Sequence, residues 1–219
     1  MDVRRLARIA GLGGAALAIG VAASGGPGRD ADERAFRAVN GAADPRLDRT
    51  AGAITELGSI WASIGAAAVR LDRTAGAITE LGSIWASIGA AAVLALAGHR
   101  RAAGRGLVAA GSVWLLGQGL KRVFERPRPY EADAEGTRLL IGTPRASSWP
   151  SSHPAVLLAF VEAAGRDAGL RPAARVALTG LAGAVGVSRV VVGVHYPADV
   201  AGGLLLGRAV AEGVARNGR

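Results

Sequence analysis

The stretch "SRVVVGVHYPAD" (residues 188–199) sets Arg189, His195 and Asp199 around a run of valines, between two of the most apolar segments of the chain. Charged groups beside a membrane-length apolar segment are costly, so they either reach water or take part in chemistry. Pro197 favours the first turn of a helix, which puts Asp199 in that turn. We therefore expect a polar site at the mouth of an apolar helix.

The composition around this stretch indicates a membrane protein. Half of the 219 residues are hydrophobic and the mean hydropathy is +0.30, yet only 4% are aromatic. The apolar residues are mainly small, and small residues let helices pack closely in a bilayer. The net charge of +9 comes from arginines that flank apolar runs, which favours a membrane over a nucleic acid as partner. The chain has no cysteine, which excludes disulfides, thiolate metal sites and cysteine nucleophiles.

Several apolar runs approach the roughly 17–25 residues that a bilayer requires. They cover residues 6–23, 51–69, 75–97, 104–120, 154–170, 173–193 and 197–214. The sequence predicts an all-α fold, a polytopic transmembrane helical bundle of six core spans plus one extra duplicated hydrophobic segment, in a single domain over 1–219. Residues 1–24 are a first membrane helix or a signal-like segment, and we favour the uncleaved helix. The polar segment 24–50 is expected to hold a short surface helix.

One segment of the chain is duplicated. Residues 46–69 read "RLDRTAGAITELGSIWASIGAAAV", and residues 70–93 repeat them letter for letter. Repeat folds normally have diverged copies and about three units, so this pair indicates a tandem duplication. The positive-inside rule favours the Arg-rich segments 98–105 and 165–175 on the same inner side as the N-terminus. That topology requires that one copy does not span as a regular membrane helix.

With six spans, three polar stretches fall together on the outer face. They are "KRVFERPRPY" (121–130), "SSWPSSHPA" (147–155) and "SRVVVGVHYPAD" (188–199). Each combines basic side chains or histidine with proline or serine. Their convergence predicts a single site there, one that binds an anion.

The residue types in these stretches suit a phosphate. Lys121, Arg128 and Arg189 would supply three cations, and planar guanidinium groups bind phosphate well. In "SSHP", the proline sets Ser151 and Ser152 at a helix N-terminus, where backbone N–H groups attract an anion.

The two histidines of these stretches have distinct candidate roles. Asp199 could accept the Nδ1 proton of His195, which would leave Nε2 facing the phosphate as a nucleophile. His153 would then protonate the leaving oxygen. Two histidines and one aspartate among three cations make a poor metal site, so we expect no metal.

The three stretches resemble the motifs of the type 2 phosphatidic acid phosphatase superfamily, the lipid phosphate phosphatases, in its bacterial membrane branch. The family pattern K-x6-R-P matches "KRVFERPRP", and S-R-x5-H-x3-D matches residues 188–199 in full. P-S-G-H matches "PSSH" (150–153) with Ser152 in place of glycine. That change is expected to alter rate or substrate preference, because glycine permits closer backbone approach.

The resemblance implies a phosphohistidine intermediate on His195, with Asp199 orienting it and His153 as the acid. It also implies phosphate contacts and no metal or other cofactor. The residues implied to bind phosphate are Lys121, Arg128, Ser151, Arg189 and the backbone near Ser152.

The function predicted from the sequence is hydrolysis of a lipid phosphate or polyprenyl pyrophosphate by a multi-pass protein of the cytoplasmic membrane, with its site on the outer face. A phosphotransferase that uses the same site is one alternative. A membrane protein impaired by the duplication is another. The apolar runs argue against a soluble, vanadate-dependent haloperoxidase. The sequence predicts no oligomeric state.

Other polar and glycine-rich features are interpreted as structural. Arg122 and Arg126 are expected to form a solvated helix end, and Glu162 to be a polar packing residue. "GLAGAVG" (180–186) and "GGLLLG" (202–207) are expected to be helix-packing faces, because they lack the strand-turn-helix context of a phosphate loop.

Overall fold

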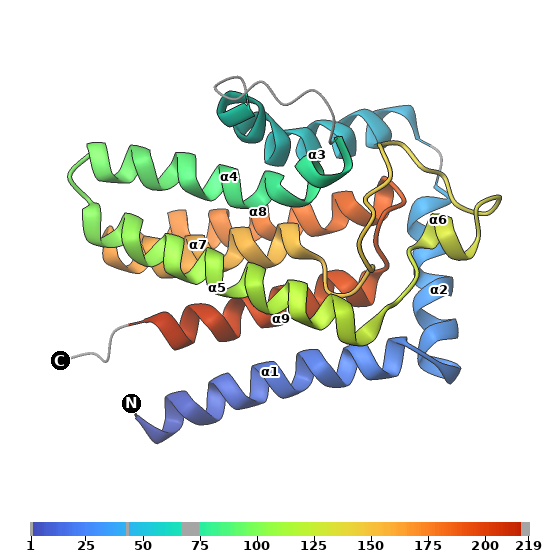
Figure 1. Cartoon of the computed structure of the whole chain (residues 1–219), viewed down its shortest axis with the longest axis horizontal. Helices are drawn as coiled ribbons and strands as arrows, with labels where there is room; N and C mark the ends of the chain where they lie inside the picture. The colour runs from blue at the N-terminus through green and yellow to red at the C-terminus, as the bar shows by residue number, and fades with distance from the viewer. Residues whose placement is uncertain (1, 43, 67–74, 216–219) are drawn as a thin grey trace.

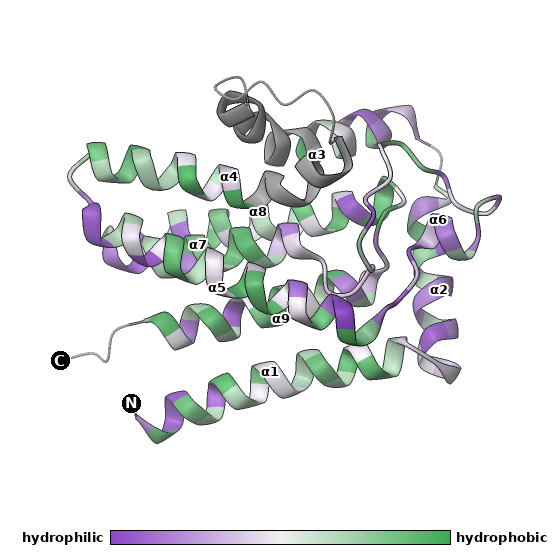
Figure 2. Ribbon diagram, in the orientation of Figure 1, coloured by the Kyte–Doolittle hydropathy of each residue, from purple (hydrophilic) through white to green (hydrophobic). Residues whose placement is uncertain are grey.

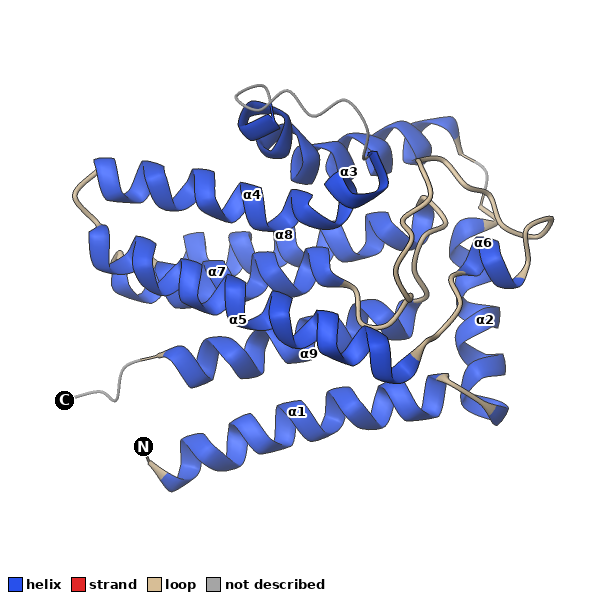
Figure 3. Ribbon diagram, viewed as in Figure 1, coloured by secondary structure: helices blue, strands red, loops and turns tan. Residues whose placement is uncertain are grey.

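The computed structural model describes residues 2–42, 44–66 and 75–215, and the side chains of these ranges outside 56–83. Within these residues the chain forms nine helices and no strand, as Figures 1 and 3 show. The helices are α1 (Val3–Ala23), α2 (Gly26–Asn40), α3 (Pro45–Ala66), α4 (Ala75–Leu96), α5 (Arg100–Phe124), α6 (Pro129–Ala132), α7 (Ser152–Asp167), α8 (Pro172–Val191) and α9 (Pro197–Val214). The all-α prediction is confirmed.

Proline begins several of these helices. Pro172 and Pro197 lie in the first turn of α8 and α9, where their missing N–H costs no hydrogen bond. Gly169, with φ of +67°, follows the end of α7 in a conformation that favours glycine. Local sequence thus sets where the chain turns between the last three long helices.

The long helices lie side by side and turn at two opposite ends (Figure 1). The start of α1, the end of α9, the α4–α5 turn and the α7–α8 turn lie at one end. The end of α5, the start of α7 and the α8–α9 turn meet at the other end, beside α2 and α6, and we call this the motif end. The Arg-rich segments 98–105 and 165–175 therefore share an end with the N-terminus, as the topology argument expected.

Both copies of the repeat contribute a helix. α3 and α4 each have 22 residues, and α4 packs against α5 and α7 while α3 packs against α8 and α4. After both helices the chain is back at the end where α1 begins (Figure 1). Residues 67–74 and the side chains of 56–83 lie outside the described part of the chain, and the expectation that one copy does not span stays a prediction.

Among the described residues, α1 and α8 are long and apolar enough to cross a membrane. Figure 2 shows apolar residues along the long helices and hydrophilic residues gathered on α2 and α6 at the motif end. The short surface helix expected in 24–50 is α2. The count of six spans stays a prediction.

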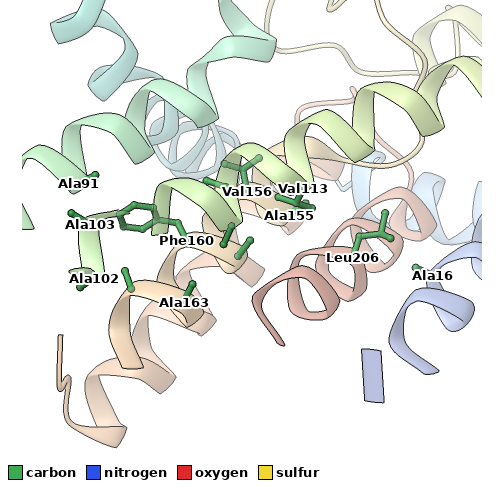
Figure 4. Packing of buried hydrophobic residues seen from close by; sticks show 14 of the residues in the cluster. Ala16, Ala91, Ala102, Ala103, Val113, Ala155, Val156, Phe160, Ala163 and Leu206 are labelled. Carbon is green, nitrogen blue, oxygen red and sulfur yellow. The ribbon is translucent and has the colours of Figure 1, made fainter. Parts of the chain in front are cut away.

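The core joins α5, α7 and α9. Most of its side chains are small, and Phe160 and Leu206 are among its larger members (Figure 4). A Cβ atom at Gly203 would lie 2.4 Å from the carbonyl oxygen of Ser151, and one at Gly207 would lie 2.5 Å from that of Ala155. Only glycine permits such an approach of α9 to the α7 backbone. The packing role predicted for 202–207 is confirmed.

The second glycine-rich segment, 180–186, fits its prediction only in part. A Cβ at Gly186 would lie 2.4 Å from Val200, so this glycine does pack closely. A Cβ at Gly180 or Gly183 would meet nothing within 4 Å, because these positions face away from the tight contact. For those two glycines the prediction of a packing face is wrong.

Glu162 of α7 is a packing residue, as predicted, and it holds three helices together. Its carboxylate accepts from Arg208 of α9 at 2.6 Å, from Arg166 at 3.1 Å and from Thr179 of α8 at 3.3 Å. Arg5 of α1 donates to the Glu212 carbonyl of α9 at 2.6 Å. These contacts hold α1, α7, α8 and α9 together in the part of the bundle that lies away from the motif end.

The glycine contacts predict opposite effects of the same substitution at two positions. Gly207→Ala should destabilise the protein by about 1–3 kcal/mol, since its new methyl group meets backbone that cannot move aside. Gly183→Ala should stabilise it by up to about 1 kcal/mol, because alanine favours a helix and the site is open. Thermal unfolding in detergent checks both, and a Gly207→Ala protein as stable as Gly183→Ala would contradict the packing argument.

Candidate active site

The three polar stretches predicted to converge all lie at the motif end. Lys121 is in the last turn of α5, and Arg128 precedes α6. The serines and His153 lie at the start of α7. Arg189 is in the last turn of α8, His195 lies in the turn that follows, and Asp199 is in the first turn of α9. The predicted site residues are all buried, namely Lys121, Arg128, Ser151, Ser152, His153, Arg189, His195 and Asp199.

The α8–α9 turn sets the direction of His195. Gly193 has φ of +83°, and a Cβ there would lie 2.6 Å from the Arg138 carbonyl oxygen, so the position requires glycine. The N–H groups of Val194 and His195 both donate to the Arg189 carbonyl at 3.2 Å. Helix α8 therefore ends within the valine run of the motif, and the chain turns back so that His195 lies against the last turn of α8.

His195 and Asp199 face each other, with 3.4 Å between the Nδ1 and Oδ2 atoms. The same Oδ2 accepts from the Ser148 hydroxyl at 2.5 Å and from the Tyr196 N–H at 2.8 Å. The Ser151 N–H donates to the Asp199 carbonyl at 3.0 Å, which joins the start of α7 to the start of α9. Nδ1 is thus on the carboxylate side of the ring, and Nε2 points to the other side.

Nε2 of His195 faces Arg128. The guanidinium Nη1 lies 3.3 Å from Nε2 and donates to the Val194 carbonyl at 2.9 Å, while Nε donates to the Ala146 carbonyl at 2.7 Å. Lys121 donates to the neighbouring Ser147 carbonyl at 3.0 Å. Two of the predicted cations therefore contact the segment that leads into α7.

The hydroxyl groups of Ser151 and Ser152 are buried and accept or donate no hydrogen bond within the described part of the chain. Buried hydroxyls normally have a partner, because leaving them without one costs free energy. They lie at the N-terminus of the 16-residue helix α7, where the backbone N–H groups and the helix dipole favour an anion. This end of α7 is thus suited to bind anionic oxygen atoms.

The environment of His195 favours its neutral form. Burial, and then the positive charge of Arg128, lower the pKa of His195 to about 3, although the Asp199 carboxylate opposes them. A neutral imidazole has a free electron pair on Nε2, so it can act as a nucleophile at neutral pH. No group of three or more His, Cys, Asp or Glu suited to a metal ion is found among the described residues.

The prediction that Arg126 belongs to a solvated helix end is wrong. Its side chain is 5% exposed and bridges two carboxylates, that of Asp199 at 2.6 Å and that of Asp32 at 2.7 Å. Arg122 is exposed, as expected. The signal for Arg126 was its place two residues before Arg128 and directly before Pro127, since a residue before proline favours an extended conformation and alternate residues of an extended segment face the same way.

Helix α2 covers the site, a role that the sequence analysis missed. Phe36 packs edge-on against Tyr196 at 5.3 Å between ring centroids, and Arg126 lies 4.2 Å from the centre of the Tyr196 ring. Asn40 donates to the Arg138 and Val191 carbonyls, each at 2.9 Å. These contacts fix α2 to the turn that carries His195.

Two cavities adjoin Tyr196 on the sides of α2. One of about 190 Å³ lies between the ends of α1 and α5 and is lined by Arg29, Phe124 and Arg126 among others. The other, of about 120 Å³, lies between α2 and α6 and is lined by Arg29, Glu33 and Arg37 among others. Polar and charged groups therefore surround the space next to the buried site.

Comparison with known proteins agrees with these motifs. The family model described as the PAP2 superfamily matches residues 102–217. The decaprenylphosphoryl-5-phosphoribose phosphatases of two Mycobacterium tuberculosis strains, CDC 1551 / Oshkosh and ATCC 25618 / H37Rv, are each 36% identical to the chain over 120 residues. The matched part is 53% of this chain and 62% of each relative, so the chain spans less than two thirds of their length.

Two solved structures share the fold. A transmembrane PAP2 type phosphatidylglycerolphosphate phosphatase from Bacillus subtilis superposes with a TM-score of 0.67 at 22% identity, over 94% of each chain. LpxE from Aquifex aeolicus superposes with a TM-score of 0.61 at 23% identity, over 80% of this chain and 89% of that one. The chain therefore shares its fold with a transmembrane PAP2 type phosphatase and with LpxE.

The electrostatics of His195 predict that its imidazole stays neutral between pH 8 and pH 5. A lowered pKa of about 3 means that protonation begins only well below this window. Nuclear magnetic resonance of ¹⁵N-histidine-labelled protein in detergent checks this, with His195→Gln to assign the signal. A His195 signal that moves to the charged form by pH 5 would contradict the account of its environment.

Proposed function

The chain belongs to the PAP2 superfamily, and we propose that it is a membrane phosphatase that removes phosphate from a lipid phosphate or polyprenyl pyrophosphate. The observation that carries this proposal is the buried His195–Asp199 pair, in which the second ring nitrogen of His195, Nε2, lies 3.3 Å from the Arg128 guanidinium group. A nucleophile beside a cation is what phosphoryl transfer requires.

In this proposal the phosphate binds between Arg128, Arg189 and Lys121, at the N-terminus of α7. The hydroxyls of Ser151 and Ser152, buried without a partner within the described residues, would donate to its oxygens. Arginine suits this role because its planar donors match pairs of phosphate oxygens. Arg128 lies 3.3 Å from Nε2 of His195, so a phosphate oxygen bound to Arg128 would bring phosphorus next to the attacking atom.

The first step forms a bond between Nε2 of His195 and phosphorus and breaks the bond from phosphorus to the leaving oxygen. His153 gives its proton to that oxygen. His195 keeps its Nδ1 proton, and Asp199 accepts a hydrogen bond from that N–H and stabilises the positive charge that develops on the ring.

The second step returns the enzyme to its starting state. Water attacks phosphorus, His153 takes a proton from that water, and the bond from phosphorus to Nε2 breaks. Inorganic phosphate leaves, and His195 is again neutral. The three cations would neutralise the negative charge on the transferring phosphoryl group, so no metal ion is required.

A lipid substrate fits the surroundings of the site. The site lies at one end of a bundle whose long helices are rich in apolar residues (Figure 2), so an acyl or prenyl chain could lie along the bundle while its phosphate enters the site. The curated relatives bear the name of a decaprenyl-linked sugar phosphate, which supports a polyprenyl substrate. The charged cavities beside Tyr196 would accept its polar head group.

We further propose that the protein lies in the cytoplasmic membrane with its motif end outside. The Arg-rich segments 98–105 and 165–175 gather at the opposite end, next to the N-terminus (Figure 1). The positive-inside rule puts such segments in the cytoplasm. The substrate phosphate would then be on the outer leaflet.

The proposed chemistry predicts release of phosphate by the purified protein in detergent with EDTA present. The substrates are phosphatidic acid, decaprenyl phosphate and undecaprenyl pyrophosphate. His195→Ala should lower the rate by roughly 10³-fold or more, since it removes the nucleophile, and His99→Ala, at an exposed histidine, should not. Equal rates for His195→Ala and the wild type, or a rate abolished by EDTA, would contradict the mechanism.

A further inference from the structure

Arg126 is a buried cation outside the three motifs, and it contacts the aspartate behind the proposed nucleophile. We propose that Arg126, linked to Asp32 of α2, is a positioning residue that holds Asp199 in the orientation His195 requires. This inference rests on the proposed function, because it assigns Arg126 a role in that reaction.

The hydrogen bonds divide the two oxygens of Asp199 between separate tasks. Arg126 donates to Oδ1 at 2.6 Å. Ser148 and the Tyr196 N–H donate to Oδ2, the atom that faces Nδ1 of His195. Since Arg126 takes Oδ1, the carboxylate cannot rotate to exchange its oxygens without losing a charged hydrogen bond, one of the stronger kinds.

Asp32 holds the other side of Arg126 and the helix that carries Asp199. Its Oδ2 accepts from Arg126 at 2.7 Å, and its Oδ1 accepts from the N–H of Ala198 at 2.9 Å. Ala198 lies in the first turn of α9, where N–H groups have no partner within the helix. Asp32 therefore fixes both the guanidinium and the backbone next to Asp199.

Burial makes this bridge effective. All three side chains are buried, so their attraction is weakly screened by water. Burial raises the pKa of Asp32, and the hydrogen bond from Arg126 opposes that rise. Removing the arginine would leave two buried carboxylates without a shared cation, which is costly.

Arg126 also affects His195 through charge. The charged groups with large direct effects on the pKa of His195 include Arg128, Asp199 and Lys121. Arg126 neutralises part of the Asp199 charge from the far side, which limits how strongly Asp199 favours a protonated ring. Without it the pKa of His195 should rise, an effect that a purely structural contact would not produce.

The test uses two substitutions and a matched control in the full chain. Arg126→Gln keeps a donor but removes the charge, and Arg126→Lys keeps the charge but cannot bridge two carboxylates with a rigid fork. The control, Arg122→Gln, removes an exposed arginine from the last turn of α5, just before the link that carries Arg126. Size-exclusion chromatography and thermal unfolding establish that each protein is folded.

We expect Arg126→Gln to lower kcat by roughly 10- to 100-fold, as is typical of residues that orient a functional ligand, with KM within about twofold. Its ¹⁵N-labelled His195 should protonate at a higher pH than in the wild type. Arg126→Lys should recover part of the rate and titrate like the wild type. Arg122→Gln should match the wild type in both measurements.

Asp32→Asn tests the link to α2. If Asp32 acts through Arg126, the double variant with Arg126→Gln should be no slower than Arg126→Gln alone. A folded Arg126→Gln protein with wild-type kcat and an unchanged His195 titration would overturn the inference. A wild type that releases no phosphate would instead overturn the proposed function, and the titration would still decide whether Arg126 acts on His195.

Discussion

The Asp199 carboxylate receives contacts from three separate segments at the motif end. Arg126 comes from the α5–α6 link, Ser148 from the segment before α7, and the Tyr196 N–H and His195 from the α8–α9 turn. A fully buried carboxylate is costly unless its oxygens are hydrogen-bonded, so each segment stabilises the others through this one group. The geometry of the candidate site therefore depends on the need to hydrogen-bond both oxygens of the buried Asp199 carboxylate.

Close helix packing makes this convergence possible. Gly203 lets α9 approach the backbone of Ser151, and the Ser151 N–H then donates to the Asp199 carbonyl at 3.0 Å. A larger residue at Gly203 would separate the start of α7 from the start of α9. The glycines that let α9 pack closely against α7 therefore also determine how the site residues at the start of these two helices are placed.

The all-α fold was predictable from the lengths of the apolar runs, and the gathering of the site residues from the alternation of consecutive helices between two ends of a bundle. The motif from Ser188 to Asp199 lies within a single helix–turn–helix, so its geometry follows from nearby residues. Arg126 was misjudged because a basic residue at a helix end is usually solvated, and its partner Asp32 lies far away along the chain, on α2. Gly180 and Gly183 were misjudged because composition does not indicate which helix face meets a neighbour.

The central claim, that His195 attacks phosphorus, is tested most directly by isolating the phosphorylated enzyme. The protein would be mixed with ³²P-labelled substrate, quenched in alkali within milliseconds, digested and analysed by mass spectrometry. The account predicts an acid-labile, alkali-stable phosphate on the peptide that contains His195, and no labelled peptide when His195 is replaced by alanine. Phosphate on another residue, or release of phosphate by direct attack of water with no labelled protein at any time, would contradict it.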